Sequence, residues 1–235
     1  MPYRRLPNTD KARLRALATA YTKGKNMVPI RLPFPVATLN QTDRTYKDFL
    51  QLMEAKKKSY KERIAINKKF LDQQLKTKLY ISHFIQVLNM CIQREEIPKS
   101  ERKYFGLEED SQTIPEIQNV NDILHWGETI IKGDDKRVLK GGNRIYNPKP
   151  AVLKIEFLKF KDLYEKKLIA NRIHESNTEK IKNMRFDVDA LIADIWNKTE
   201  EYFKNSDLYT ARKKCEAFGV VYVNRKKENI IKGMM

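Results

Sequence analysis

The sequence predicts an all-α protein: a bundle of two pseudo-repeated long helical hairpins, each with a short closing helix, plus a basic N-terminal arm and a central helical insert. Two observations carry this prediction. Residues 42–97 contain neither glycine nor proline, and their apolar side chains recur at helical spacing. Residues 151–218 have the same character, and a Phe-Gly pair closes each stretch.

The two stretches align as an internal duplication. Phe49-Leu50 recurs as Phe157-Leu158 at an offset of 108, and Phe105-Gly106 recurs as Phe218-Gly219 at an offset of 113. Any two amphipathic helices align passably at their best phase, but element order, phase and terminator agree here, so we favour duplication. An apolar stripe recurs at an offset of 107, with Ile81, Phe84, Ile85, Leu88 and Ile92 in the first copy and Val188, Leu191, Ile192, Ile195 and Thr199 in the second.

Residues 1–40 are predicted to form a basic arm with one helix. Thr9 is a good N-cap for a helix that begins at Asp10, and Gly24 is placed to end it after about Thr22. Three prolines then favour an extended strap, because each removes a backbone donor and restricts the residue before it. The apolar residues that would anchor this strap on the helices are Ile30, Leu32 and Phe34.

Residues 41–106 are predicted to be the first helical repeat. A single helix over residues 42–97 would be roughly 80 Å long at 1.5 Å per residue. We therefore expect the chain to fold back at a turn or kink within Ile66–Gln73. Pro98 then starts a short closing helix, Lys99–Phe105, which Gly106 terminates.

The insert, residues 107–150, is predicted to carry one helix. This helix runs from about Asn121 to Ile131, with Asn119 or Asn121 as its cap and Gly133 as its stop. A tight turn at Gly141-Gly142-Asn143 leads into the second copy.

The second helical repeat spans residues 151–224. Its hairpin turn is expected in Ile173–Thr178, where Ser176 or Thr178 can cap the following helix. A closing helix over Leu208–Phe218 and a short segment of β propensity at 220–223 follow, and residues 225–235 form a basic tail. A helical pair of this size cannot cover its own apolar stripe, so we expect both copies to share one core in a single globular domain.

The net charge of the chain indicates which kinds of partner it would attract. The chain has 47 Lys and Arg against 30 Asp and Glu, a formal charge of +17. Residues 1–40 hold 8 basic residues and 1 acidic residue, whereas residues 107–150 hold 6 basic and 8 acidic residues. Such a surplus attracts polyanions, although lysine-rich composition alone also places lysines on solvated helix faces.

Two basic clusters are the candidate polyanion-binding sites. The first lies on the arm, where arginines offer forked donors and Lys11 and Arg15 share one helix face. The second is a lysine run that interrupts the apolar stripe of its helix; its plain interpretation is a solvated face with snorkelling stems. The candidate residues are Arg4, Arg5, Lys11, Arg13, Arg15, Lys56, Lys57 and Lys58.

No residue pattern indicates an enzyme, a metal site or a cofactor. His83, His125 and His174 lie on separate elements, and Cys91 and Cys215 lack metal-ligand or redox spacing. Asp187 and Asp189 stand two apart on a helix and so point to different faces, unlike a paired-carboxylate site. Gly141-Gly142 lacks the strand and the Gly-Lys-Ser/Thr of a phosphate-binding loop, and no other catalytic motif occurs.

Three segments resemble an uncharacterised group of bacterial all-helical proteins: residues 2–10, the Ile-Leu-His-Trp-Gly stretch at 123–127 and the Phe-Gly-Val-Val-Tyr stretch at 218–222. This resemblance implies a bacterial, cytoplasmic and helical protein. It implies no activity, ligand or catalytic residue.

The leading functional hypothesis is a non-enzymatic helical interaction or scaffolding module that binds a protein partner or self-associates. The alternative is a nucleic-acid- or ribosome-associated protein that uses the basic arm and the lysine run. We expect a cytoplasmic location and no membrane partner, because no segment approaches the roughly 20 apolar residues of a membrane span. No small-molecule substrate is evident.

Overall fold

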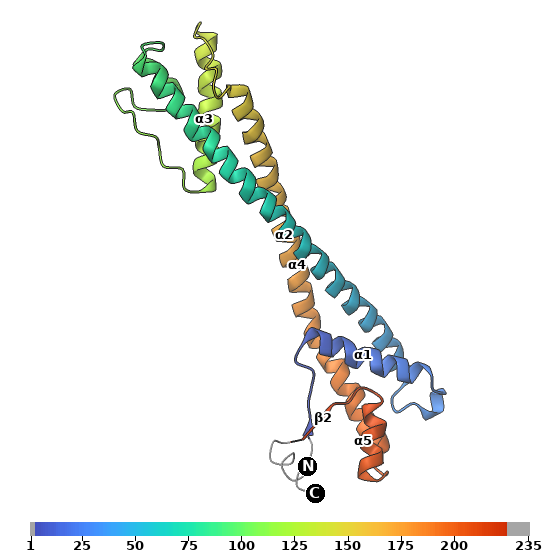
Figure 1. Cartoon of the computed structure of the whole chain (residues 1–235). Helices are drawn as coiled ribbons and strands as arrows, with labels where there is room; N and C mark the ends of the chain where they lie inside the picture. The colour runs from blue at the N-terminus through green and yellow to red at the C-terminus, as the bar shows by residue number, and fades with distance from the viewer. Residues whose placement is uncertain (1–2, 225–235) are drawn as a thin grey trace. The chain divides into compact units, whose positions relative to one another are not determined.

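The computed structural model describes residues 3–224, and within them the all-α prediction is confirmed (Figure 1). Two long helices pack together, and shorter elements cover their ends. The elements in chain order are β1 (Tyr3–Arg4), α1 (Asp10–Lys25), η1 (Pro29–Arg31), α2 (Val36–Gln93), η2 (Lys99–Phe105), α3 (Val120–Leu139), α4 (Pro150–Phe203), α5 (Leu208–Glu216) and β2 (Tyr222–Val223). The predicted basic tail at 225–235 lies outside the described residues.

The predicted hairpin turns are wrong, because α2 and α4 are single continuous helices of 58 and 54 residues. In α2 the segment expected to turn contains Phe70, which is buried against Phe160 of α4 with ring centroids 5.6 Å apart. In α4 the Thr178 hydroxyl donates to the carbonyl of His174 at 2.8 Å, one turn back, instead of capping a new helix. Helix-forming residues without glycine or proline therefore continue through both sites.

The chain divides into two compact units. Unit 1 comprises residues 1–59 and 174–235, and unit 2 comprises residues 60–173. Each unit contains one part of α2 and one part of α4, so the second helix of each expected hairpin is supplied by the other copy. The expected single shared core is accordingly replaced by two cores.

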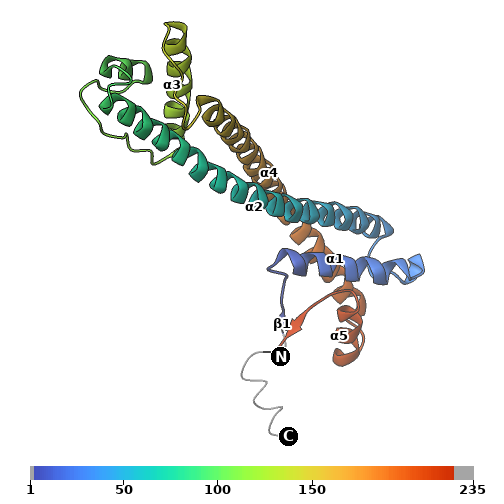
Figure 2. The ribbon, with the colours of Figure 1, turned by 45° about the horizontal axis from the view of Figure 1, so that its top comes forward.

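The core of unit 1 is formed by α1, the first part of α2, the last part of α4 and α5 (Figure 2). Its buried side chains include Trp196, which is 1% exposed. Phe34 reaches this core from the strap and packs edge-on against Phe218 with ring centroids 5.8 Å apart. The two short strands pair antiparallel, with Tyr3 opposite Val223, and hold both ends of the described chain beside this core.

The core of unit 2 gathers the last part of α2, η2, α3 and the first part of α4. Phe84 and Phe105 meet edge-on with ring centroids 5.3 Å apart. The antiparallel pairing of α2 with α4 here follows from their contacts, since Phe70 meets Phe160 while Gln73, later in α2, bonds Glu156, earlier in α4. Ile85 is buried in this core, and its counterpart Ile192 is buried in the core of unit 1.

The two halves of the chain share structural features beyond the predicted repeats. The Phe-Gly terminators adopt left-handed conformations, with φ of 66° at Gly106 and 90° at Gly219. A Cβ on Gly219 would lie 3.3 Å from Thr19 Cβ of α1, and one on Gly106 would lie 3.2 Å from Thr129 Cγ2 of α3. Thr19 and Thr129 both stand ten residues after the N-cap of their helix. We infer that α1 and α3 are themselves equivalent, so that residues 10–106 and 120–219 are the repeated segments.

Two glycines expected to stop helices lie inside them instead. Gly24 is buried in α1 with no room for a Cβ, which would lie 2.6 Å from Leu39 Cδ1. Gly133 is buried in α3, where a Cβ would lie 2.3 Å from the carbonyl oxygen of Tyr104. In the strap, Leu32 and Phe34 are buried as predicted, but Ile30 is 90% exposed because η1 turns the chain there.

Candidate functional site

Two of the predicted polyanion-binding arginines are engaged within unit 1. Arg4 Nη1 donates to Asn197 Oδ1 at 2.7 Å and to Glu200 Oε2 at 2.9 Å. Glu200 also accepts a hydrogen bond from the Tyr222 hydroxyl at 2.7 Å. Arg4 thus fastens β1 to α4 and is committed to the fold.

Arg13 belongs to a pair of reciprocal arginine forks between α1 and α4. Arg13 grips Asp189 through Nε and Nη2, both at 2.8 Å. Arg185 grips Asp10 through the same two atoms, also at 2.8 Å. Bidentate geometry makes these strong charge-assisted hydrogen bonds. They give Asp189 a structural role as the carboxylate partner of Arg13.

The forks shift the pKa values of their members. The hydrogen bond from Arg185 lowers the pKa of the Asp10 carboxyl, and nearby Lys56 lowers it further. The hydrogen bond to Asp189 raises the pKa of Arg13. Lys56 is half-buried and interacts with the Asp10 carboxylate of this network. Lys57 and Lys58 are exposed to solvent instead.

Two other predicted arginines line a groove of unit 1, which we call the arginine groove. Its volume is about 610 Å³, and it runs between the segment before α1, one face of α1 and the segment after α5. Its lining includes Arg5, Asn8, Arg15, Thr19, Trp196 and Glu216. The backbone N–H of Arg5 donates to Val221 O at 2.9 Å. This bond fixes the Arg5 backbone at the edge of the groove.

Arg5 and Arg15 are exposed, and their side chains form no ion pair with residues 3–224. The exposed Lys11, Lys57 and Lys58 likewise lack a carboxylate partner within that range, but none of the three lines the groove. The structure therefore brings two of the eight predicted residues together at one concave surface.

A second candidate surface lies on α2 within unit 2, and we call it the leucine face. It consists of Ile64, Leu71, Leu75 and Leu79, whose exposed fractions are 51%, 48%, 69% and 67%. The i, i+4, i+8 spacing of the leucines places them on one side of the helix. By contrast, Val36 is the one large apolar residue exposed in the part of α2 that belongs to unit 1.

Basic residues accompany the leucine face. Lys68 and Lys78 are exposed at positions that the helical pitch places among the leucines, and Asp72 is the acidic neighbour. Ile64 and Leu71 also line a groove of about 470 Å³ that extends to Lys167 of α4. The surface is thus apolar with a basic surround.

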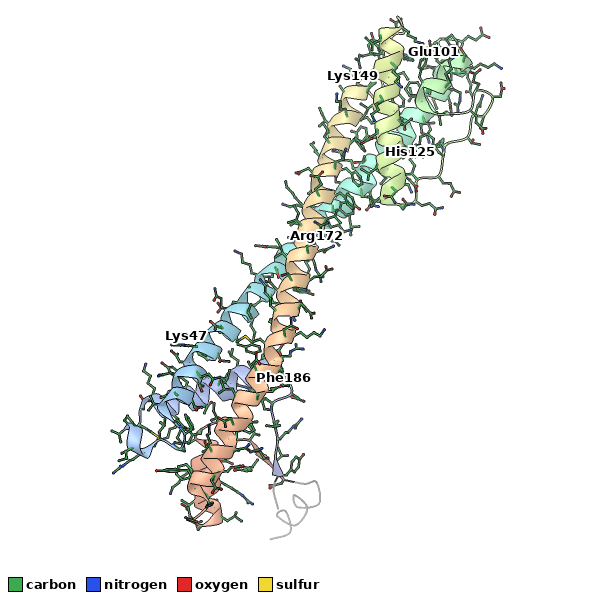
Figure 3. The ribbon with its side chains drawn as sticks, turned by 180° about the vertical axis from the view of Figure 1, so that it is seen from behind. Lys47, Glu101, His125, Lys149, Arg172 and Phe186 are labelled. Atoms are coloured by element: carbon green, nitrogen blue, oxygen red, sulfur yellow. The ribbon has the colours of Figure 1, made fainter. Side chains whose placement is uncertain are left out.

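A further set of exposed apolar residues lies on the α4 part of unit 2. Ile155, Leu158, Ile169 and Ile173 are each about half exposed, on the side of α4 away from its buried Phe157 and Phe160. Asp162 and Glu165 stand between Leu158 and Ile169, so this side has mixed charge. In unit 1 the exposed Phe186 of α4 is isolated by comparison (Figure 3).

The histidines and cysteines occupy ordinary environments. His174 Nδ1 lies 3.2 Å from the Ser59 hydroxyl. His125, which is labelled in Figure 3, packs edge-on against Trp126. Among residues 3–224, no group of three or more His, Cys, Asp or Glu side chains is arranged to hold a metal ion. Burial raises the pKa of both the Cys91 and the Cys215 thiol, which disfavours thiolate chemistry.

No helix in the described part of the chain has the length and apolar character needed to cross a membrane. Comparison with known proteins found no matching family model, no matching curated protein and no matching solved structure.

The leucine face escaped prediction because it overlaps the segment expected to turn. A turn between Ile66 and Gln73 would have separated Ile64 from Leu75. The usable signal was the unbroken i, i+4 series Leu71, Leu75 and Leu79, which is out of phase with the buried series that includes Ile81 and Phe84.

Proposed function

We propose that the chain is a non-enzymatic helical interaction module whose leucine face binds an acidic amphipathic helix of a protein partner. The observation that carries this proposal is the series of exposed leucines on a helix that has already buried a different side. Soluble proteins seldom expose contiguous apolar surface unless it meets a partner. Helix-in-groove recognition uses anchors at this spacing.

The dimensions of the leucine face suit a short helix. From Ile64 to Leu79 the helix rises about 22 Å, or four turns. Burying the exposed half of four such side chains contributes about 4 kcal/mol before the costs of association. The apolar contacts alone therefore support weak binding, and charge complementarity has to supply the remainder.

The basic residues beside the leucine face favour an acidic partner. Lys68 and Lys78 would meet their own counterparts if two copies paired through this surface, and like charges oppose such pairing. A helix with glutamates or aspartates beside its apolar stripe places opposite charges there instead. The proposal therefore commits to an acidic partner helix.

Binding of designed peptides tests the proposal. A helical peptide with leucines at i, i+4 and i+8 and glutamates beside them should bind the full chain, as measured by fluorescence anisotropy. The same peptide with lysines in place of the glutamates should bind at least about tenfold more weakly, because it repels Lys68 and Lys78.

Two double variants locate the surface. Leu75→Asp with Leu79→Asp should abolish binding of the acidic peptide, while the matched control Leu158→Asp with Ile169→Asp makes the same change at exposed apolar residues of α4 and should leave binding unchanged. Circular dichroism checks that each variant is folded. Equal affinity for both peptides, or equal loss in both variants, would contradict the proposal.

A nucleic-acid- or ribosome-associated function is our second candidate. It is supported by the exposed Arg5 and Arg15, whose side chains form no ion pair within residues 3–224 and line one groove of unit 1. It is weakened by Arg4 and Arg13, whose guanidinium groups are held by carboxylates. Binding of RNA that weakens steeply with salt is its expected signature.

A further inference from the structure

We propose that the arginine groove of unit 1 is a phosphate-binding site, in which Arg5 and Arg15 grip adjacent phosphate groups of a polyanion. This inference names the site that the second candidate function would use, and it is independent of the leucine face.

The two arginines reach the groove from separate elements. Arg5 follows β1, where its backbone is fixed by the bond to Val221, and Arg15 stands on α1. Their neighbours in sequence, Arg4 and Arg13, are fastened to α4 by carboxylates. The ion pairs of Arg4 and Arg13 thus fix the backbone that carries Arg5 and Arg15, which form no ion pair with residues 3–224.

The remaining lining suits an anion. Asn8, Thr9 and Thr19 supply polar groups, and Glu216 is the single carboxylate among the lining residues. The groove also adjoins the N-terminus of α1, where the helix dipole favours negative charge. Arginine offers planar forked donors that match phosphate oxygens.

Unit 2 provides an internal comparison. Counting from the N-caps Thr9 and Asn119, the position of Arg5 corresponds to Pro115 and that of Arg15 to His125. The segment after Gly106 is acidic, with Glu108, Glu109 and Asp110, whereas the segment after Gly219 begins with two valines. The duplicated scaffold forms without these arginines in unit 2, so its folding does not account for them in unit 1.

The ligand chemistry follows from the charges. Two guanidinium groups in one groove, with no ion pair to any residue of 3–224, call for at least two negative groups on one ligand. Phosphates linked in a chain meet this requirement, and nucleic-acid backbones and inorganic polyphosphate share that chemistry. The experiment separates these sources.

The test is binding of fluorescein-labelled single-stranded RNA to the full chain by anisotropy, over a series of salt concentrations. The double variant Arg5→Ala with Arg15→Ala should weaken binding at least about tenfold and reduce the salt dependence by about two phosphate contacts. The matched control Lys57→Ala with Lys58→Ala removes the same charge from unit 1 outside the groove and should change affinity less than about twofold.

Competition identifies the source. If inorganic polyphosphate displaces the RNA completely, the groove recognises phosphate itself, and the proposal stands. Polyphosphate that binds while RNA does not, with the same loss in the arginine variant, would also support it and would exclude nucleic acid as the ligand. Equal losses in the arginine and lysine variants would indicate non-specific charge attraction and would overturn the proposal, as would absence of binding by both probes.

Discussion

Unit 1 and unit 2 contain equivalent helices and differ in what they leave exposed. Unit 1 has the arginine groove and the reciprocal forks between α1 and α4. Unit 2 has the leucine face and a second apolar side on α4. Since buried positions of the repeat stay apolar while exposed positions diverge, the comparison separates residues that the fold requires from residues available for binding.

The two units also differ in how their partly or fully buried charged groups are paired. In unit 1, Arg13 and Arg185 each meet a carboxylate through both fork atoms. In unit 2 the buried Arg102 donates to the Asn89 side chain and the Glu108 carbonyl, which are neutral, and desolvation lowers its pKa. Arg137 bonds Glu101, but its Nε and Nη2 atoms are buried without a partner in the described structure. Arginines that lack a full set of charged partners are therefore found in unit 2, and their burial is less well compensated than that of the arginines in unit 1.

The largest expected effect tests whether the two cores are equivalent. Ile85→Ala in unit 2 and Ile192→Ala in unit 1 should each cost about 2–5 kcal/mol in the free energy of unfolding, because each removes a fully buried side chain. Urea denaturation measures the loss, and hydrogen exchange shows where the protein loosens. Faster exchange in the opposite unit would break the assignment of these residues to separate cores.

A smaller effect tests the paired terminators. Gly106→Ala and Gly219→Ala each place a Cβ on a left-handed residue against a helix, and each should destabilise the protein by about 1–3 kcal/mol. Thermal unfolding of both variants beside Gly141→Ala provides the comparison. Gly141 also has positive φ but open space around its Cβ position, so steric contact is the difference. Equal losses at all three sites would assign the whole effect to backbone conformation.

The smallest expected effect is a pH dependence of the free energy of unfolding. It concerns one carboxylate in each unit. In unit 2, hydrogen bonds from Gln73, Lys159 and Lys76 lower the pKa of Glu156 to about 2. A carboxyl whose pKa is lowered by folding adds stability above its unfolded pKa of about 4.3, and this contribution is lost as the pH falls toward 2. Asp10 in unit 1 has the same sign of shift, caused first by Arg185.

Urea denaturation between neutral and acidic pH checks this. Glu156→Gln should be less stable than the parent at neutral pH, and the difference should shrink as the pH falls through the range between these two pKa values. Asp10→Asn is the counterpart in unit 1. A difference that stays constant over this range would show that packing, and not ionisation, is responsible.

The sequence predicted the helical class, the cap at Thr9 and the paired Phe-Gly terminators, because each depends on neighbouring residues. For the insert helix it left Asn119 and Asn121 as alternative caps, and the structure has Asn119. Sequence-based prediction failed where the local structure depends on contacts with residues far away in the chain. Leu39 occupies the space beside Gly24 in α1, and Phe70 packs against Phe160 of the other copy at the position where the length of the helix had predicted a turn.

The candidate site was predicted in part for the same reason. Charge density on the arm drew attention to Arg5 and Arg15, which line a groove, but the sequence could not show that Asp189 and Glu200 pair with Arg13 and Arg4. Those carboxylates lie more than 170 positions away along the chain. Pairing across such separations is set by the fold.

The mixing of both repeats in each core bears on the ancestry of the molecule. An ancestral polypeptide with a single repeat would have held one long helix and no return helix, so it could have closed these cores only as a homodimer. Gene fusion would then have freed the two copies to change independently, which is how Arg15 and the leucine face, both within residues 10–106, could arise in one copy alone. By the same logic, residues 1–112 and 113–235 expressed as separate polypeptides should each be unstable alone and should reconstitute the fold when mixed.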